Sequence, residues 1–515
     1  MTRDLFRSTT VFSVNTLFSR ILGFARDIIF AHFFGAIAGF DAFLVAFKLP
    51  NFMRRLFAEG AFSQAFIPIL SQYRETKTHS EVREFISYIF GGLGATLLLL
   101  SLIVILAAPL VTTVFAPGFI HSIRFLLATT MIRITFPYLL LIGLAAACAA
   151  VLNCYGSFGI PAFSAVWLNV VLIAMAFIAQ RYFKVPVYGL AWGVVIAGVV
   201  QLSFLLPFLY FKKLLPRPRL SFSNPGVRRV LFLMVPAIFG VSMVQVSILI
   251  DTVFASFLKT GSVSWLYYSN RLTEFPLGVF GVAIATVILP KLSRHHIKAR
   301  SLAYSKTLDW ALHLLLLVAP PSSIGLFILS GPLLSTLFQG GKFTPTDVMM
   351  ARESLMAFSI GILAAMSVKI LSSCFYARQN IKTPAKIAAW AVLFNILLNL
   401  ILIFPLKHAG LALSTSLAAF FNASCLLFLL LKQKIYRPQS QWLKELMRFL
   451  IADCVMGMFL FFVVKPLPVW LVQRELWRIG RLSFAVFSAV VIYWFVLFVL
   501  RYPFAQLWQR EEVWK

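Results

Sequence analysis

The chain is dominated by apolar runs that are long enough to cross a lipid bilayer as helices. Such runs occupy residues 92–114, 168–180, 314–329, 387–404 and 484–500. A helix of about 20 mostly apolar residues spans a bilayer, and these runs lack the alternation of a membrane β-barrel strand. Of the 515 residues, 60% are hydrophobic and 12% are charged, whereas a soluble chain has about 25% charged residues. The sequence therefore predicts an all-α integral membrane protein and excludes a water-soluble fold.

The formal net charge of +29 indicates membrane topology instead of a nucleic-acid partner. Basic residues gather in alternate loops, at 212–229, 291–300 and 432–444, and the loops between them carry few. Because cytoplasmic loops are enriched in Lys and Arg, these three loops are expected to face the cytoplasm. This topology gives about fourteen transmembrane helices with both termini cytoplasmic. The basic segment 465–481 departs from the rule beside the last two predicted spans.

Three collinear matches within the chain indicate an internal duplication, because all three have a spacing of 221 to 223 residues. The matched segments are 66–71 with 288–293, 161–167 with 384–390, and 189–191 plus Lys213 with 410–412 plus Lys434. A copy with an even number of spans returns the chain to the side where it began, so both copies enter the membrane in the same orientation.

The duplication divides the chain into three predicted parts. Residues 1–222 are expected to form an N-terminal six-helix lobe and residues 223–440 a pseudo-symmetric C-terminal six-helix lobe. Residues 441–515 add two further helices that have no counterpart in the duplication. Two lobes related by an axis along the membrane normal are expected to enclose a central cavity between them.

Charged and polar side chains occur within the first two predicted spans and at the matching place in the second lobe. The first two spans contain Ser19, Arg20, Arg26, Asp27, Asp41, Lys48, Asn51, Arg54, Arg55 and Glu59, and the second lobe contributes Asn270, Arg271 and Glu274. One Arg or Lys near the bilayer centre costs about 2.5 to 3.5 kcal/mol, so several facing lipid would cost roughly 10 kcal/mol. We therefore expect this group to face a wet cavity.

The excess of arginine over acidic partners predicts an anionic substrate. A guanidinium donates two parallel hydrogen bonds to a phosphate and stays protonated, which suits a phosphate or pyrophosphate in a low-dielectric cavity. Each arginine taken singly also fits a helix-end anchor whose charge reaches the membrane surface. Pro50 is expected to distort the second span, so helical periodicity does not decide between Arg54 and Arg55 as the cavity residue.

A second polar group suits a monovalent cation. Asp251 is the acid of the seventh predicted span, Asn395 and Asn399 lie one turn apart in the eleventh, and Thr415 lies in the twelfth. One carboxylate with neutral oxygens can coordinate a small hard cation, although Asn and Thr also tie membrane helices together by hydrogen bonds.

Motifs for catalysis are missing from the sequence. No Asp-x-Asp or Asp-Asp pair is present to hold a metal on lipid phosphates. The stretch Gly340-Gly341-Lys342 departs from a phosphate-binding loop because Phe343 follows the lysine and Thr336 replaces the first glycine. We therefore expect a transporter without a cofactor and not an enzyme.

Several motifs give the chain a family resemblance. They are Ser-Arg-Ile-Leu-Gly-Phe-Ala-Arg-Asp at 19–27, Asp41-Ala-Phe, the stretch 47–68 with Lys-Leu-Pro-Asn and Arg-Arg-Leu-Phe-Ala-Glu-Gly, then 261–268, 271–276, 339–343 and 382–384. Together they resemble the MurJ family of bacterial lipid II flippases across nearly the whole chain.

The resemblance implies the fold of the multidrug and oligosaccharidyl-lipid flippase superfamily, with the two last helices forming a groove for a polyprenyl tail. It implies that Arg20, Arg26, Arg54 and Arg271 line the cavity and bind the pyrophosphate and sugar headgroup. Between the two adjacent arginines it selects Arg54. The expected supporting residues are Ser19, Asp27, Asp41, Asn51, Glu59 and Glu274. Some relatives have a second acid where this chain has Asn399.

The expected function is translocation of lipid II, the undecaprenyl-pyrophosphate-linked peptidoglycan precursor, by alternating access across the bacterial cytoplasmic membrane. This activity serves cell wall biogenesis and cell shape, with coupling to Na⁺, H⁺ or the membrane potential. The protein is expected to be a monomer that associates with cell-wall synthesis proteins. Export of another polyprenyl-linked oligosaccharide stays open as the nearest alternative. A cation-coupled drug exporter fits the arginine excess poorly, and an envelope scaffold or channel is the alternative from another class.

Overall fold

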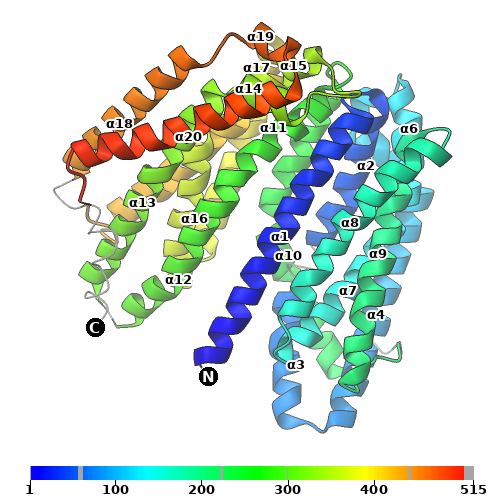
Figure 1. Cartoon of the computed structure of the whole chain (residues 1–515). Helices are drawn as coiled ribbons and strands as arrows, with labels where there is room; N and C mark the ends of the chain where they lie inside the picture. The colour runs from blue at the N-terminus through cyan, green and yellow to red at the C-terminus, as the bar shows by residue number, and fades with distance from the viewer. Residues whose placement is uncertain (1, 56–61, 221–223, 299, 439–441, 504–515) are drawn as a thin grey trace. The chain divides into compact units, whose positions relative to one another are not determined.

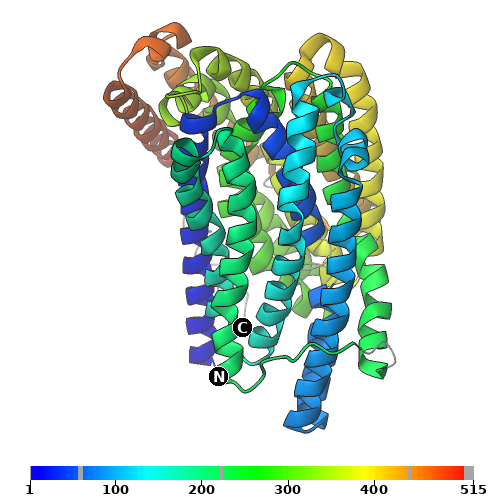
Figure 2. The same cartoon turned by 90° about the vertical axis from the view of Figure 1, so that its right-hand side faces the viewer.

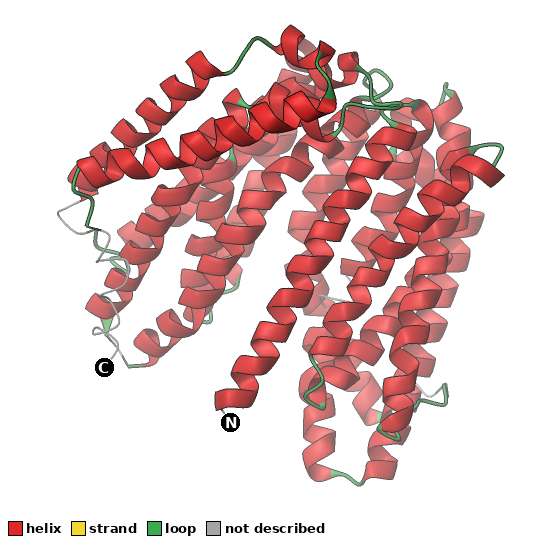
Figure 3. Ribbon diagram, in the orientation of Figure 1, coloured by secondary structure: helices red, strands yellow, loops and turns green. Residues whose placement is uncertain are grey.

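The computed structural model describes residues 2–55, 62–220, 224–298, 300–438 and 442–503. Within these ranges every regular element is a helix and no strand occurs, as Figure 3 shows. Nine helices in this part of the chain are long and apolar enough to cross a membrane, or ten if the bent pair α15 (Pro345–Ile360) and α16 (Ile362–Ala377) is one span. The prediction of an all-α membrane protein is confirmed, while the number fourteen stays a prediction.

A first compact unit extends from residue 1 to Ser264. Its helices are α1 (Thr2–Phe34), α2 (Ala38–Met53), α3 (Ser63–Thr76), α4 (His79–Leu106), α5 (Ala108–Phe115), α6 (Ile123–Thr135), α7 (Pro137–Cys154), α8 (Gly159–Tyr182), α9 (Pro186–Phe211) and α10 (Pro225–Ser256), with a short 3₁₀ turn, η2 (Pro117–Phe119), after α5. Helix α8 packs against α1 and α9, and α2 packs against α6. Figure 2 shows the hairpin of α3 and α4 in blue at the lower end of the view.

Small residues allow α8 and α9 to approach closely. A Cβ atom on Gly189 would lie 2.4 Å from the Cβ of Ala179, and one on Gly193 would lie 3.0 Å from the Cβ of Met175. Helices in membranes associate by close van der Waals packing, which small side chains permit. These two glycines therefore form the part of α9 that lies against α8.

The second compact unit extends from Trp265 to the C-terminus. Its helices are α11 (Ser262–Pro276), which begins just before the boundary, α12 (Val282–Ile297), α13 (Ser301–Ile328), α14 (Ser330–Leu337), α15, α16, α17 (Lys382–Lys432), α18 (Trp442–Val463), α19 (Leu467–Val472) and α20 (Glu475–Val499). After Pro276 the backbone forms a π-helical turn, η3 (Leu277–Gly281). Helix α17 consists of two helices joined at a kink, where Lys407 has φ of 51°.

The C-terminal helices form a hairpin on α13 and α14. Figure 1 shows α18 in orange beside α20 in red. The buried carboxylate of Glu445 in α18 contacts the imidazole of His313 in α13. Tyr493 Oη in α20 donates to the Leu317 carbonyl at 2.9 Å, and Arg478 Nη1 donates to Gln339 Oε1 at 2.8 Å. Buried polar contacts thus attach this hairpin to the rest of the second unit.

The chain reverses direction in the same way at the ends of α9 and α17. Lys213 and Lys434 both adopt a left-handed backbone, with φ of 55° and 54°. The amide of the residue after each lysine donates to a carbonyl five residues earlier, at 2.9 Å and 3.0 Å. This is the hydrogen-bonding pattern of a Schellman cap. The identical caps support the duplication inferred from the matched lysines.

The predicted lobe boundaries at 222 and 440 stay predictions. Helix α10 begins after residue 222, yet it packs against α3, α4 and α5 and so lies in the first compact unit. A boundary between two duplicated sequences reflects the evolutionary origin of the chain, whereas the boundary of a compact unit reflects which helices pack together. The two divisions of one chain therefore need not coincide.

Candidate functional site

Arg26 lies in a buried polar network between α1 and α8. Its side chain donates to Asp27 Oδ1 through Nε at 3.0 Å and Nη2 at 2.7 Å. Its Nη1 donates to Asn169 Oδ1 at 3.1 Å, and Asn169 Nδ2 donates to the Ser19 carbonyl at 3.1 Å. Arg26 is 6% exposed and Asp27 is 0% exposed. The network therefore compensates the positive charge of Arg26 and fixes the orientation of its guanidinium plane.

The structure brings three predicted residues, Ser19, Arg26 and Asp27, into this network, whereas Arg20 is exposed on α1. Sequence reasoning missed Asn169. The available signal was an amide inside the apolar run 168–180, since a polar residue within a span needs a partner.

The end of α2 holds the adjacent arginines. Pro50 lies within α2, and Arg54 is the C-terminal cap residue that directly follows the last residue of the helix. Arg54 is half-buried and its Nε lies 3.4 Å from Asn51 Oδ1, whereas Arg55 is exposed. Glu59 lies outside the described residues. Arg54 and Asn51 therefore lie together on the less exposed side of this helix end.

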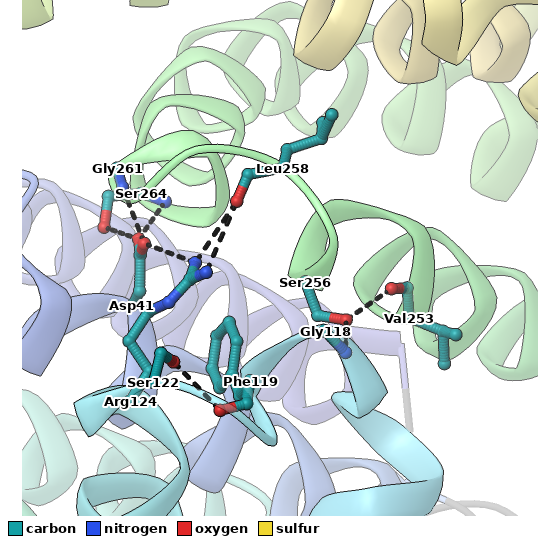
Figure 4. A network of polar contacts seen from close by, with 10 residues as sticks. All are labelled: Asp41, Gly118, Phe119, Ser122, Arg124, Val253, Ser256, Leu258, Gly261 and Ser264. Atoms are coloured by element: carbon teal, nitrogen blue, oxygen red, sulfur yellow. Dashed lines mark hydrogen bonds and ion pairs between the residues drawn. The ribbon is translucent and has the colours of Figure 1, made fainter.

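Asp41 of α2 accepts hydrogen bonds from the end of the loop between α10 and α11 and from the first turn of α11 (Figure 4). Its carboxylate is fully buried and accepts from the Gly261 amide at 2.7 Å, the Ser264 amide at 3.0 Å and the Ser264 hydroxyl at 2.6 Å. The guanidinium of Arg124 in α6 lies 3.8 Å from the same carboxylate and 4.3 Å from the centre of the Phe119 ring. Asp41 thus connects three segments of the first unit.

Arg124 was missed as a functional or structural partner by sequence reasoning, because a single basic residue in a predicted external loop carries no distinctive pattern. Its Nη1 and Nη2 atoms also lie 3.4 Å from the Leu258 carbonyl, which belongs to the same loop that Asp41 binds. Asp41 and Arg124 therefore both bind this segment of the chain. The Asp41 carboxylate accepts from its amides, and the Arg124 guanidinium donates to its carbonyl.

In the second unit, Arg271 and Glu274 of α11 form an ion pair. Arg271 Nη1 lies 2.8 Å from Glu274 Oε2, and Asn270 Nδ2 donates to Glu274 Oε1 at 3.1 Å. The side chains of Arg271 and Glu274 are 30% and 46% exposed. Glu274 therefore orients Arg271 while much of the pair remains accessible to a ligand.

The predicted cation ligands occur in two different units. Asp251 is half-buried in α10, where the ammonium of Lys48 interacts with it electrostatically and donates to the hydroxyl of Thr252 at 2.9 Å. In α17, Asn399 Nδ2 donates to Asn395 Oδ1 at 3.1 Å, and Thr415 donates to the Leu411 carbonyl at 3.0 Å. In the described part of the chain, no three His, Cys, Asp or Glu side chains gather as a metal would require.

Comparison with known proteins decides the family. The sequence matches the family described as "Lipid II flippase MurJ" over residues 30–480. The chain belongs to the MurJ family of lipid II flippases. The "Lipid II flippase MurJ" of Burkholderia cenocepacia is 40% identical over 99% of this chain and 100% of its own length. The "Probable lipid II flippase MurJ" of Buchnera aphidicola subsp. Acyrthosiphon pisum is 41% identical, covering 95% of this chain and 96% of the relative.

Solved structures agree with the MurJ assignment. The structure named "Lipid II flippase MurJ, inward closed conformation" has a TM-score of 0.81 and 26% identity, and covers 95% of this chain and 99% of its own. An inward-facing multidrug transporter of the MATE family has a TM-score of 0.66 at 13% identity, over 81% of this chain and 94% of its own, which shows a shared fold. The predicted superfamily fold and family are confirmed. The prediction that the chain is not an enzyme is confirmed as well, because the MurJ family consists of transporters.

Replacing Asn169 by Asp is expected to lower lipid II transport about ten-fold. The new carboxylate would be a second anion beside Arg26, and it would weaken the attraction of that guanidinium for an anionic headgroup. Asn169→Ala removes the hydrogen bond without adding charge and should cost less. The measurement is transport in reconstituted vesicles, with thermal unfolding to verify folding. Equal transport by folded Asn169→Asp and wild-type protein would contradict a substrate role for Arg26.

Proposed function

We propose that this chain translocates lipid II from the cytoplasmic to the outer leaflet of the bacterial cytoplasmic membrane by alternating access. The observation that carries this function is the relationship to MurJ flippases along the whole chain, including 40% identity to the lipid II flippase of Burkholderia cenocepacia. Transport of this kind needs no covalent chemistry. Both termini are proposed to lie in the cytoplasm, because the three basic loops then fall on that side.

We propose that Arg20, Arg26, Arg54 and Arg271 bind the anionic headgroup. Two observations support this. Arg26 and Arg271 are each oriented by a neighbouring carboxylate, so less side-chain entropy is lost when either binds a ligand. Arg20 and Arg271 are accessible enough for a ligand to reach. Guanidinium groups match a pyrophosphate because each can donate two parallel hydrogen bonds to its oxygens.

The polyprenyl tail is proposed to remain in the bilayer beside α18 and α20. A long apolar tail has no favourable place in a chamber lined by arginine, so a carrier must leave it a path in lipid. The exposed surface of the terminal hairpin is apolar, with Phe461 and Phe462 on α18 and Phe487 and Phe495 on α20 between 64% and 81% exposed. These side chains supply the surface on which a tail can lie.

Removing residues 441–515 is expected to stop lipid II transport while headgroup binding persists. Because the hairpin also covers His313 and Leu317, the same deletion exposes buried polar groups, so a milder variant is needed. Phe487→Ser with Phe495→Ser should lower transport several-fold. The control is Phe404→Ser, which replaces a phenylalanine on α17 that is 82% exposed, more than either Phe487 or Phe495.

Folding, headgroup binding and transport must be measured separately for these variants. The tail proposal is wrong if the truncated protein stays folded and transports lipid II at the normal rate. It is also wrong if the control variant loses as much transport as the double variant on α20.

The driving force is proposed to be the membrane potential, with a cation at Asp251 biasing the return of the empty carrier. Moving one charge across 100 mV changes the free energy by about 2.3 kcal/mol, and an anionic headgroup moves outward in the favourable direction when the cell interior is negative. Because the ammonium of Lys48 interacts electrostatically with Asp251, a cation that binds this carboxylate must compete with Lys48. Collapsing the potential, the Na⁺ gradient and the H⁺ gradient one at a time in vesicles distinguishes the three sources.

Complementation in cells tests the function as a whole. In bacteria depleted of their own lipid II flippase, this chain is expected to restore wall growth and cell shape. A drug exporter or an O-antigen flippase would leave the depleted cells unable to extend their wall, and that outcome would overturn the proposal.

A further inference from the structure

The second unit contains a cavity of about 180 Å³ where four helix ends meet. His295 and His296 come from the end of α12, and Arg300 directly precedes α13. Arg378 caps the end of α16, and Lys434 follows the end of α17. These five residues line the cavity, which we call the basic pocket. All of its walls belong to one compact unit.

Positive charge dominates the basic pocket. Arg300, Arg378 and Lys434 are basic, and no carboxylate is among the residues that line the cavity in the described part of the chain. Within the described residues, none of these three has an ion-pair partner. Like charges that share a cavity repel one another, and a bound anion relieves that repulsion. The pocket therefore has the electrostatics of an anion site.

The duplicated half of the chain provides an internal comparison. The spacing of 223 residues pairs Arg378 with Tyr155. In the first unit the ring of Tyr155 contacts two cations, with the guanidinium of Arg74 at 5.1 Å and the ammonium of Lys212 at 5.8 Å from its centre. An aromatic ring thus attracts the cations of the first half by cation–π interaction. In the second half a guanidinium, Arg378, stands where the first half has this ring, so its cations have no aromatic partner at the matching position.

We propose that the basic pocket binds a phosphomonoester. A phosphomonoester carries a charge of about −1.5 to −2 near pH 7 and three acceptor oxygens, which suits three fixed positive charges better than the single charge of a phosphodiester. Basic pockets between membrane helices on the cytoplasmic side are known to hold lipid headgroups, and the surrounding loops are the basic ones predicted to face the cytoplasm. The phosphate can belong to a membrane lipid or to a soluble molecule, since both offer the same chemistry.

Binding of defined probes to the full chain in phosphatidylcholine nanodiscs tests the proposal. The probes are phosphatidic acid as the phosphomonoester lipid, phosphatidylglycerol as the phosphodiester lipid, and inorganic phosphate. Bound lipid is counted by native mass spectrometry and phosphate affinity is measured by calorimetry. We expect phosphatidic acid to be retained at least about ten-fold more strongly than phosphatidylglycerol. Retention of phosphatidic acid alone assigns the site to a lipid headgroup, and measurable affinity for inorganic phosphate as well assigns it to phosphomonoesters in general.

Two variants connect binding to the pocket. Arg378→Gln removes one charge, and Lys434→Gly removes another at a backbone with φ of 54°, a conformation that glycine adopts without strain. Each should weaken phosphomonoester binding about ten-fold, as expected for losing one charge-assisted hydrogen bond. The matched control is Lys213→Gly, which removes a lysine from the equivalent cap of the first unit, where φ is 55°. This control should leave binding unchanged.

Several results would overturn the proposal. They are the absence of binding by wild-type protein to both phosphomonoester probes, equal retention of the two lipids, and an equal loss in Lys213→Gly. The wild-type results decide even if a variant fails to fold, which thermal unfolding reveals. Complementation of lipid II transport is measured on the same variants, so failure of this site leaves the flippase function separately tested.

Discussion

Replacing Arg271 by Ala is expected to reduce lipid II transport at least about 100-fold while leaving a normal amount of protein in the membrane. The guanidinium is oriented by Glu274 at 2.8 Å and is 30% exposed, so it is placed for a ligand and contributes little to packing. Hydrogen bonds to charged groups contribute about 1.5 to 3 kcal/mol each, and two such bonds to a pyrophosphate account for the expected loss. Transport of labelled lipid II in vesicles provides the measurement.

The Lys variant separates charge from geometry. Arg271→Lys keeps the positive charge but cannot donate two parallel hydrogen bonds, so it should rescue transport poorly. Glu274→Gln keeps the shape of the orienting side chain and should cost less than Arg271→Ala. Near-normal transport by Arg271→Ala would remove this residue from the substrate site, whereas full rescue by lysine would show that only its charge matters.

Replacing Asp41 by Ala is expected to lower the free energy of unfolding of the first unit by about 3 to 5 kcal/mol, which is the cost of removing one partner of a buried ion pair. The carboxylate is 0% exposed, and its loss leaves two amides and the Ser264 hydroxyl without their acceptor and the guanidinium of Arg124 without its counter-ion. Thermal unfolding in detergent should show a large decrease in Tm.

Double variants and a surface control test this interpretation. Asp41→Ala with Arg124→Ala should be less destabilised than the sum of the single variants, because removing both charges leaves no unpaired buried ion. Glu81→Gln changes an exposed carboxylate at the capping box of α4 and should cost less than about 1 kcal/mol. If Asp41→Ala unfolds at the same temperature as wild-type protein, the network of Figure 4 is not a major source of stability.

The fold could be predicted from the sequence because its signal is local and repeated. Apolar runs about 20 residues long specify membrane helices by length and composition alone. Lys213 and Lys434 occupy equivalent caps at the ends of α9 and α17, so the short sequence match that indicated the duplication has a local structural counterpart. Signals of this kind require no knowledge of distant contacts.

The partners of the predicted site residues could be found only in the structure. Arg26 binds Asn169, which is 143 residues away, and Asp41 binds Ser264, which is 223 residues away. A helical wheel describes neighbours on one helix, so it does not show that Arg26 of α1 contacts Asn169 of α8. The carboxylate of Asp27 accepts from its immediate neighbour Arg26, because the long guanidinium side chain folds back along α1.

The choice between Arg54 and Arg55 shows a different limit. Helical periodicity does not predict which arginine faces inward, because α2 continues after Met53 as a wider π-helical turn that contains both arginines. The resemblance to the family selected Arg54, and the structure places this side chain in the less exposed position beside Asn51. Its substrate role stays a prediction that requires transport measurements.

The most direct test is translocation of fluorescent lipid II by the purified chain in sealed vesicles, with a membrane potential imposed. We predict that lipid II crosses to the opposite leaflet at a rate well above that of protein-free vesicles, that a polyprenyl-linked O-antigen unit crosses much more slowly, and that Arg271→Ala abolishes the difference from protein-free vesicles. Lipid II movement equal to that of protein-free vesicles, in preparations shown to be folded, would contradict the assignment of this chain as a lipid II flippase.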